Sequence, residues 1–246
     1  GKDYPYVTER SPTSFFQFSR TAQDVTSPPG WQQTTERIMM SYPEFLSKAR
    51  EMDRYRERDE EAAEKEHYYF RLNGNREKHA NMFLYEELPF LDGNKPDSSS
   101  FFMVDTKQDH GIHCRLGMDG VTFPMHFDYD RNFIAVMGGA RRLILAHPNQ
   151  CRAMSLYPEG HPGARHSSVD WSAAVSSQEN NAHEEFQKGM VNEVVMQAGD
   201  VLYLPTHWFH MVISLGINYQ CNARSGATYE NLSVIEECGF MTKRQG

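Results

Sequence analysis

The sequence lacks several features that would indicate common functions. No run of about 18 apolar residues occurs in its 246 residues, so no transmembrane segment is predicted. A positive net charge is also absent, because 25 Lys and Arg stand against 33 Asp and Glu, which gives −8 at pH 7. This balance argues against nucleic-acid binding as the main task. Neither a GxSxG nor a Walker pattern occurs, so nothing supports a serine hydrolase or a phosphate-binding loop.

Cysteine is scarce, and its spacing is uninformative. The four cysteines show no CxxC pattern and no secretory context; they are Cys114, Cys151, Cys221 and Cys238. Such cysteines are predicted to be free thiols in a reducing compartment. The sequence therefore predicts an intracellular protein of the cytoplasm, nucleus or an organelle interior, and not a secreted one.

The composition suits a single large β domain with appendages, since 39% of residues are hydrophobic and 12% are aromatic. Residues 1–35 are rich in Ser, Thr, Pro and Gln, so 1–40 is predicted to be an extended tail or linker. The domain proper is predicted at 41–246. It divides into a helical N-terminal part (41–95), a β core (100–226) and a short C-terminal segment (227–246).

Local patterns support the helical N-terminal part. Ser41 and Glu44 form a capping box, followed by an apolar stripe at helical spacing: Phe45, Leu46, Ala49 and Met52. Residues 51–67 carry mixed charges and are predicted to form a solvated helix face, with a partner-binding surface as the alternative. Residues 68–72 are predicted to form a strand, and a loop follows from 92.

Two short segments carry metal-ligand residues. His126 and Asp128 lie two apart in the alternating, aromatic-rich segment 123–128, which predicts a strand on which both point to one side. His210 ends a second segment, 199–210. Two imidazoles and one carboxylate leave three coordination positions of a metal open, as in non-haem iron(II) oxygenases. For His126 and Asp128 alone, the alternative is chance, because short HxD patterns are common.

The remaining histidines of this region receive no metal role. The polar insert at 151–197 contains His161, His166 and His183, which are predicted to be solvated loop residues. His207 lies three residues before His210 and has the opposite strand parity. It is therefore predicted to lie behind the metal ligands or at the rim of the site.

Residues 117–226 resemble the catalytic core of the JmjC, or cupin-like, iron(II)- and 2-oxoglutarate-dependent hydroxylases. Within that group they resemble the small enzymes of the hypoxia-inducible-factor asparaginyl hydroxylase type. The similar pieces occur in the same order, at 117–120, 124–128, 132–133, 142–145, 148, 156–158, 168–170, 199–205 and 208–210. The resemblance implies a mainly β fold, a double-stranded β-helix (jelly roll) of about eight strands, flanked by N-terminal α-helices.

The resemblance also implies the roles of particular residues. His126, Asp128 and His210 would be the iron ligands. Arg141 stands where close relatives have a lysine that binds the distal carboxylate of 2-oxoglutarate, and a guanidinium can hold a carboxylate bidentately. Strand parity allows Arg141 to point inward while Arg142 points out. The alternative is that Arg141 is a surface charge on a strand edge.

Other positions near the cosubstrate match only in part. Asn132 and Asn222 match family asparagines near the cosubstrate and the metal. Phe123 replaces a threonine or serine, and Thr122, one step off, supplies the missing hydroxyl only if the strand bulges. Residues 223–224 are Ala and Arg, where relatives have aromatic residues.

The activity implied is hydroxylation of a C–H bond, in a protein or peptide substrate, with iron(II) and 2-oxoglutarate. The alternative is a catalytically impaired cupin-like scaffold that serves as an accessory subunit of a larger assembly. Because only about twenty residues follow Gly226, no family-type homodimer is expected. Contacts to other chains are expected to use aromatic residues of 1–40, unless these fold back over the protein's own barrel.

Overall fold

The computed structural model describes residues 3–17, 19, 27–57, 66–75, 83–92, 106–169 and 188–241. The strands are β1 (Tyr6–Ser11), β2 (Glu36–Met40), β3 (His67–Gly74), β4 (Asp109–Gly117), β5 (Thr122–Phe127), β6 (Asn132–Ala146), β7 (Asn192–Gln197), β8 (Val201–Leu204) and β9 (Phe209–Ser225). The helices are α1 (Tyr42–Glu57), α3 (Leu84–Glu87) and α5 (Leu232–Glu237), with 3₁₀ turns η2 (Pro89–Leu91), η3 (Thr106–Gln108) and η4 (Pro148–Met154). The mainly β, jelly-roll fold is confirmed.

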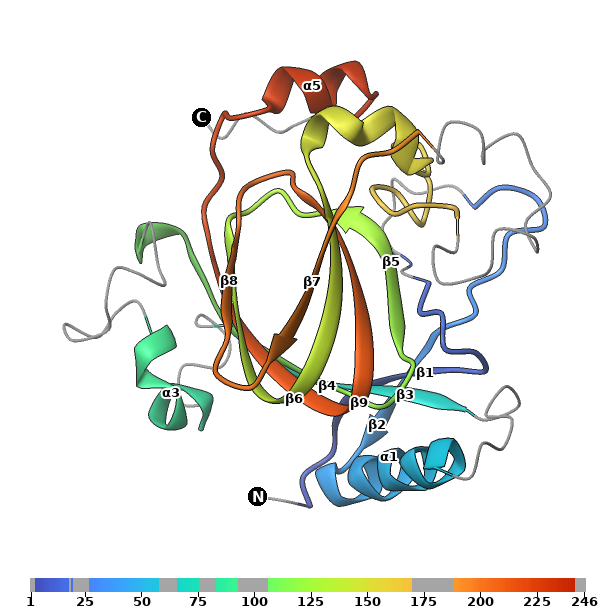
Figure 1. Ribbon diagram of the computed structural model, residues 1–246, viewed down its shortest axis with the longest axis vertical. Coiled ribbons are helices and arrows are strands. Elements are labelled where there is room, and N and C mark those ends of the chain that lie inside the picture. Colours follow the sequence, from blue (N-terminus) through green and yellow to red (C-terminus); the bar gives the residue numbers. More distant parts are fainter. Residues whose placement is uncertain are drawn as a thin grey trace.

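Two long curved strands, β6 and β9, pair with each other and run through the centre of the molecule (Figure 1). The second half of β9 also pairs with β4, and the first half of β6 with β8. The first half of β9 instead pairs with β5, and the second half of β6 with β7. Each long strand therefore belongs to two sheets that face each other across the barrel interior. The larger sheet includes β1, β2, β3, β4 and β8, and the smaller sheet includes β5 and β7.

Glycines lie where the two long strands change sheets. The β6–β9 register shifts on either side of Gly138. Gly139 has φ +68°, and a Cβ there would collide with the backbone of Ile217. Only glycine adopts this conformation at such a close approach without strain. Gly138 and Gly139 therefore determine where β6 bends from one sheet into the other.

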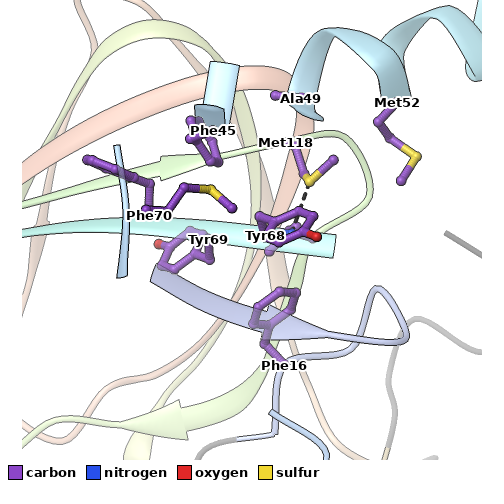
Figure 2. Packing of buried hydrophobic residues seen from close by; sticks show 10 residues of the cluster. Phe16, Phe45, Ala49, Met52, Tyr68, Tyr69, Phe70 and Met118 are labelled. Atoms are coloured by element: carbon purple, nitrogen blue, oxygen red, sulfur yellow. Dashed lines mark hydrogen bonds between the residues drawn. The ribbon is translucent and has the colours of Figure 1, made fainter. Parts of the chain in front are cut away.

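α1 packs against the larger sheet, and Figure 2 shows its side chains Phe45, Ala49 and Met52 in the same apolar cluster as Tyr68 and Phe70 of β3. The capping box predicted at its start is confirmed, because Ser41 N–H donates to Glu44 Oε2 at 2.7 Å. Phe45 packs on Phe70 of β3, with ring centroids 5.5 Å apart, and both side chains are buried. Met118 Sδ accepts a hydrogen bond of 3.0 Å from the Tyr68 amide. This apolar layer anchors β3 and thereby the sheet that backs the site.

The opposite end of the molecule is closed by α5 and η4 (Figure 1). Ile235 of α5 packs with Met154 of η4 on the outer side of the smaller sheet, where Phe127 and Phe209 are also fully buried. Phe127 points away from His126 as strand parity requires. This packing holds the two strands that carry the candidate ligands.

The segment 1–40 is not simply the tail that its composition predicted. It supplies β1 and β2, and β1 pairs with β3 in the larger sheet. Phe16 is buried in the core beside Tyr69, so this aromatic residue folds back on the protein's own barrel. Composition failed here because strand pairing with a distant segment outweighs local propensity. Phe18 lies outside the described residues.

The prediction of free thiols was wrong. Cys114 lies directly opposite Cys221 on β4 and β9, and the two form a disulfide. A second disulfide joins Cys151 of η4 to Cys238 beside α5. Both pairs are 80 or more residues apart in sequence, so spacing could not reveal them. The thiol argument for a reducing compartment no longer holds, and the compartment stays a prediction.

Within the described part of the chain, no helix combines the length and apolar character needed to cross a membrane.

Candidate metal centre

His126, Asp128 and His210 converge on one point inside the barrel. One ligand atom from each lies within 4.8 Å of the other two. His126 on β5 lies directly opposite His210 on β9, and their ring centroids are 4.1 Å apart. Mutual distances of this size leave a central point roughly 3 Å from each atom, close to the 2 Å bonds of metal complexes. The structure therefore brings the three residues together, as expected from the sequence.

The backbone orients both imidazoles. His126 Nδ1 lies 2.8 Å from the carbonyl of Pro124, and His210 Nδ1 lies 3.2 Å from that of Trp208. A carbonyl only accepts hydrogen bonds, so each Nδ1 carries the proton and each Nε2 keeps its lone pair for a ligand. Burial lowers the pKa of both histidines, with neighbouring charges adding to the effect at His126. Both rings are therefore neutral, as metal binding requires.

Asp128 supplies the negative charge. Burial alone would raise the pKa of its carboxyl, but the Arg224 and Arg165 guanidiniums hold that pKa well below its usual range. Arg224 Nη2 lies 2.8 Å from Asp128 Oδ2 and Arg165 Nη1 lies 3.7 Å from Oδ1. The Oδ2 atom is buried and accepts no hydrogen bond, although it forms the ion pair with Arg224. A buried carboxylate oxygen without a hydrogen bond, beside two neutral imidazoles, fits a divalent metal such as iron(II).

The carbonyl of Asp128 links the two ligand segments. It accepts a hydrogen bond of 3.0 Å from the amide of His207. His207 itself is buried with φ +68°, and its Nδ1 lies 3.3 Å from the carbonyl of Glu230. Its ring packs edge-on against Phe127, away from the triad. His207 therefore supports the turn that presents His210.

A bulge in β5 decides which side chain accompanies His126. The β5–β9 register shifts by one residue between Phe123 and His126, so Phe123 faces Val212 while His126 faces His210. Val212 and His210 lie on the same face of β9, hence Phe123 points to the metal side. Thr122 points the other way, and its hydroxyl donates to the Gly120 carbonyl at 3.0 Å. The strand does bulge, but the structure does not bring the Thr122 hydroxyl to the site.

Arg141 is directed inward, as the family resemblance implied and strand parity allowed. Its side chain is fully buried, whereas Arg142 pairs with Glu193 at 2.8 Å on the exposed outer face. Arg141 donates to the Tyr69 hydroxyl at 3.2 Å, to the Arg115 carbonyl at 2.9 Å and to Asn218 Oδ1. Among the described residues it has no acidic partner within ion-pair distance. A buried guanidinium without a counter-ion fits an anionic ligand, such as the distal carboxylate of 2-oxoglutarate.

Asn132 and Asn222 meet across β6 and β9. Asn222 Nδ2 donates to Asn132 Oδ1 at 3.0 Å, and both side chains are buried. This bond locks the amide orientation of each residue. Asn222 lies on the inner face of β9, two residues before Arg224, which contacts Asp128.

Several residues of the site escaped sequence reasoning. His161 and His166, predicted to be solvated, are both buried. The His166 ring stacks on that of His126, with centroids 4.6 Å apart and planes 8° from parallel. Tyr69, Arg165 and Arg224 contact Arg141 or Asp128 from other segments. The sequence contained one signal for these contacts, which was the charged Arg224 where relatives have an aromatic residue. His183 lies outside the described residues.

Comparisons with known proteins agree with this architecture. A family profile described as "Cupin-like domain" matches residues 9–230. Jumonji C domain-containing protein 5 of Drosophila melanogaster is 29% identical over 133 residues, which cover 53% of this chain and 32% of that protein. tRNA wybutosine-synthesizing protein 5 of Mus musculus is 27% identical over 160 residues, 63% of this chain and 47% of that protein.

A third relative is lysine-specific demethylase JMJ31 of Arabidopsis thaliana, 24% identical over 129 residues, 52% of this chain and 23% of that protein. The chain thus covers less than half the length of each of these relatives. The profile match extends over most of the chain, including both ligand segments. The chain belongs to the JmjC-type cupin-like domain family.

Proposed function

We propose that this protein is an iron(II)- and 2-oxoglutarate-dependent oxygenase that hydroxylates a C–H bond. The observation that carries the proposal is the convergence of His126, Asp128 and His210 inside a JmjC-type barrel. Three protein ligands on one side of an ion leave positions for a chelating cosubstrate and for oxygen. Iron(II) with 2-oxoglutarate supplies, when bound, oxidative decarboxylation coupled to hydroxylation.

The protein's own residues hold and orient the reactants. His126 and His210 present Nε2 because backbone carbonyls engage Nδ1, and Asp128 stays ionised because cations surround it. Arg141, with the Tyr69 hydroxyl beside it, is suited to bind the distal carboxylate of the cosubstrate. Phe123 packs on Tyr69, with ring centroids 4.4 Å apart, and makes this end of the interior apolar. Its ring excludes water where relatives place a hydroxyl.

The proposed substrate is a side chain of a protein or peptide. Among the relatives, one is named for demethylation of lysine and another for tRNA wybutosine synthesis. The acidic net charge of −8 favours a protein or peptide over a nucleic acid for this chain. Hydroxylation of an N-methyl group would lead to demethylation, so the two reactions share this proposed chemistry.

The test is turnover of the cosubstrate by purified protein. Under air, with iron(II), 2-oxoglutarate and ascorbate, the protein should form succinate even without substrate, at a slow uncoupled rate. His210→Ala should abolish succinate formation, while His147→Ala, which changes an exposed histidine outside the site, should not. Succinate formation by His210→Ala at the wild-type rate would contradict the proposal.

A scaffold function is the second candidate. Phe123 stands on the metal side of β5, and Arg224 contacts the carboxylate that a metal must use. Both features favour an accessory subunit that keeps the fold without turnover. A protein that binds neither manganese(II) nor iron(II) at millimolar concentrations would support this candidate.

A further inference from the structure

Asp128 faces more positive charge than it can neutralise. Arg224 and Arg165 approach different oxygens of its carboxylate, at 2.8 and 3.7 Å. Within the described ranges, neither guanidinium has another acidic group at ion-pair distance, and Asp130 pairs with His110 at 3.3 Å. The single carboxylate of Asp128 therefore already faces two guanidinium cations, without counting a metal ion.

Metal binding would enlarge this imbalance. A divalent ion would add two positive charges next to Asp128. The cosubstrate would add one negative charge there, since its other carboxylate would pair with Arg141. In a site with one carboxylate ligand and no further cations, the two negative charges of that ligand and the cosubstrate neutralise the ion. Here the two guanidiniums remain uncompensated, and uncompensated charge is costly in a site that excludes water.

Both guanidiniums also keep a buried N–H without an acceptor. Arg165 Nε and Arg224 Nε are buried and make no hydrogen bond. Arg165 is otherwise held firmly, because its Nη1 donates to the Phe127 carbonyl at 2.6 Å and its guanidinium lies 5.1 Å above the Tyr129 ring. Buried donors in native proteins normally have partners, so these two indicate a missing acceptor.

The two cations lie on the solvent side of the triad. The Arg141 side chain is fully buried, that of Asp128 is 11% exposed, and those of Arg165 and Arg224 are 17% and 33% exposed. A molecule that enters from solvent would meet Arg224 and Arg165 before the metal ligands. The cosubstrate anion at Arg141 lies deeper, so the two arginines are available to a different anion.

We infer that Arg165 and Arg224 bind an oxyanion of the substrate, a carboxylate or a phosphate, directly beside the metal. The word "substrate" rests on the proposed function, whereas the anion site itself does not require turnover. Because the oxyanion offsets the charge that opposes metal binding, the metal and the oxyanion strengthen each other's binding. Arg224 therefore weakens metal binding when no oxyanion is present.

The experiment is calorimetric titration of the cosubstrate-free protein with manganese(II) in chloride, acetate and sulfate buffers of equal ionic strength. We expect wild-type affinity to rise several-fold in one oxyanion buffer relative to chloride. A larger effect of acetate indicates a carboxylate, and a larger effect of sulfate indicates a tetrahedral phosphate group. In chloride, Arg224→Gln should bind manganese(II) about tenfold more tightly than wild type, because one opposing charge is gone. The oxyanion effect should largely disappear in this variant.

The matched control is Arg142→Gln, which removes the same charge from the exposed outer face and should behave as wild type. Weaker or unchanged metal binding by Arg224→Gln in chloride would overturn the inference, since Arg224 would then only position Asp128. Equal wild-type affinity in all three buffers would also overturn it, and this arm needs no variant to fold.

Thermal unfolding of the metal-free protein separates this inference from the proposed function. Acetate or sulfate should raise the melting temperature of wild type more than that of Arg224→Gln. If anions stabilise the protein but no metal binds, the inferred anion site is supported and the proposed oxygenase function is contradicted. If metal binds but oxyanions have no effect, the oxygenase function is supported and the anion site is contradicted.

Discussion

The two faces of the sheet formed by β3, β4 and the second half of β9 differ in their chemistry. The outer face carries buried apolar residues such as Phe70 and Ile112, packed against helices. The inner face carries polar and charged residues, among them the buried Asn222 and the half-buried Arg115 and Arg224. Successive residues of one strand alternate between these environments.

This contrast predicts that the outer face determines stability and that the inner face determines ligand binding. The outer face needs apolar volume, so a change there should alter the free energy of unfolding and leave ligand binding intact. The inner face needs each polar group to have a specific partner, so a change there should alter binding of metal or anions. Substitutions on the two faces can break or sharpen this division.

The largest effect on metal binding is expected from His210→Ala, on the inner face of the opposite sheet, where β9 pairs with β5. Loss of one of three protein ligands should weaken manganese(II) or iron(II) binding more than about hundredfold, beyond the effect typical of outer-shell changes. Calorimetric titration measures this loss, and the unfolding midpoint of the metal-free variant should stay near that of wild type. Metal affinity within a few-fold of wild type would exclude His210 as a ligand.

The outer face is tested by Phe70→Ala. Its ring is 1% exposed and packs on Phe45, so removal should cost about 3–5 kcal/mol of unfolding free energy. Denaturant titration measures the change, with Phe70→Leu as a milder control. Manganese(II) affinity of the folded variant should not change. A large loss of metal affinity in folded Phe70→Ala would break the division between the two faces.

The pair Arg141 and Arg142 tests alternation within one strand. Arg141→Ala should raise the apparent constant for 2-oxoglutarate about ten- to hundredfold, because a charge-assisted pair with a carboxylate is lost. Iron(II) binding should stay nearly intact. Arg142→Ala removes only an exposed pair with Glu193 and should change neither quantity. Equal cosubstrate constants for both variants would remove Arg141 from the site.

The smallest expected effect is a pH dependence from the inner face. Burial, with the charges of Arg115 and Arg224, lowers the pKa of His113 to about 4. The unfolded chain therefore takes up a proton near pH 6.5 while the folded protein does not, so stability is lost as pH falls from about 6.5 towards 4. At pH 5 this group should cost about 2 kcal/mol relative to pH 8. Urea titrations of wild type and His113→Gln at both pH values measure this loss of unfolding free energy. An equal loss between pH 8 and pH 5 in the variant would contradict its assignment to His113.

The alternation of side chains let the sequence alone predict much of the site. The shared side of His126 and of Asp128, which directly follows β5, and the opposite orientations of Arg141 and Arg142 follow from the period of a strand. The capping box at Ser41 likewise needs only residues three apart. These features are local, so the sequence by itself determined them, and the family resemblance extended them to the jelly-roll fold.

Only the tertiary structure decided what depends on segments far apart. The bulge that turns Phe123 to the metal side arises from pairing of β5 with β9. The disulfide of Cys114 with Cys221 and the approach of Arg165 and Arg224 to Asp128 join residues 37 to 107 positions apart. No local pattern encodes such contacts, because they depend on which strands become neighbours and in which register. The register of β9, which brings Arg224 to Asp128, and the position of Arg165 therefore decided the charge around the metal ligands, and with it the chemistry that this site can accept.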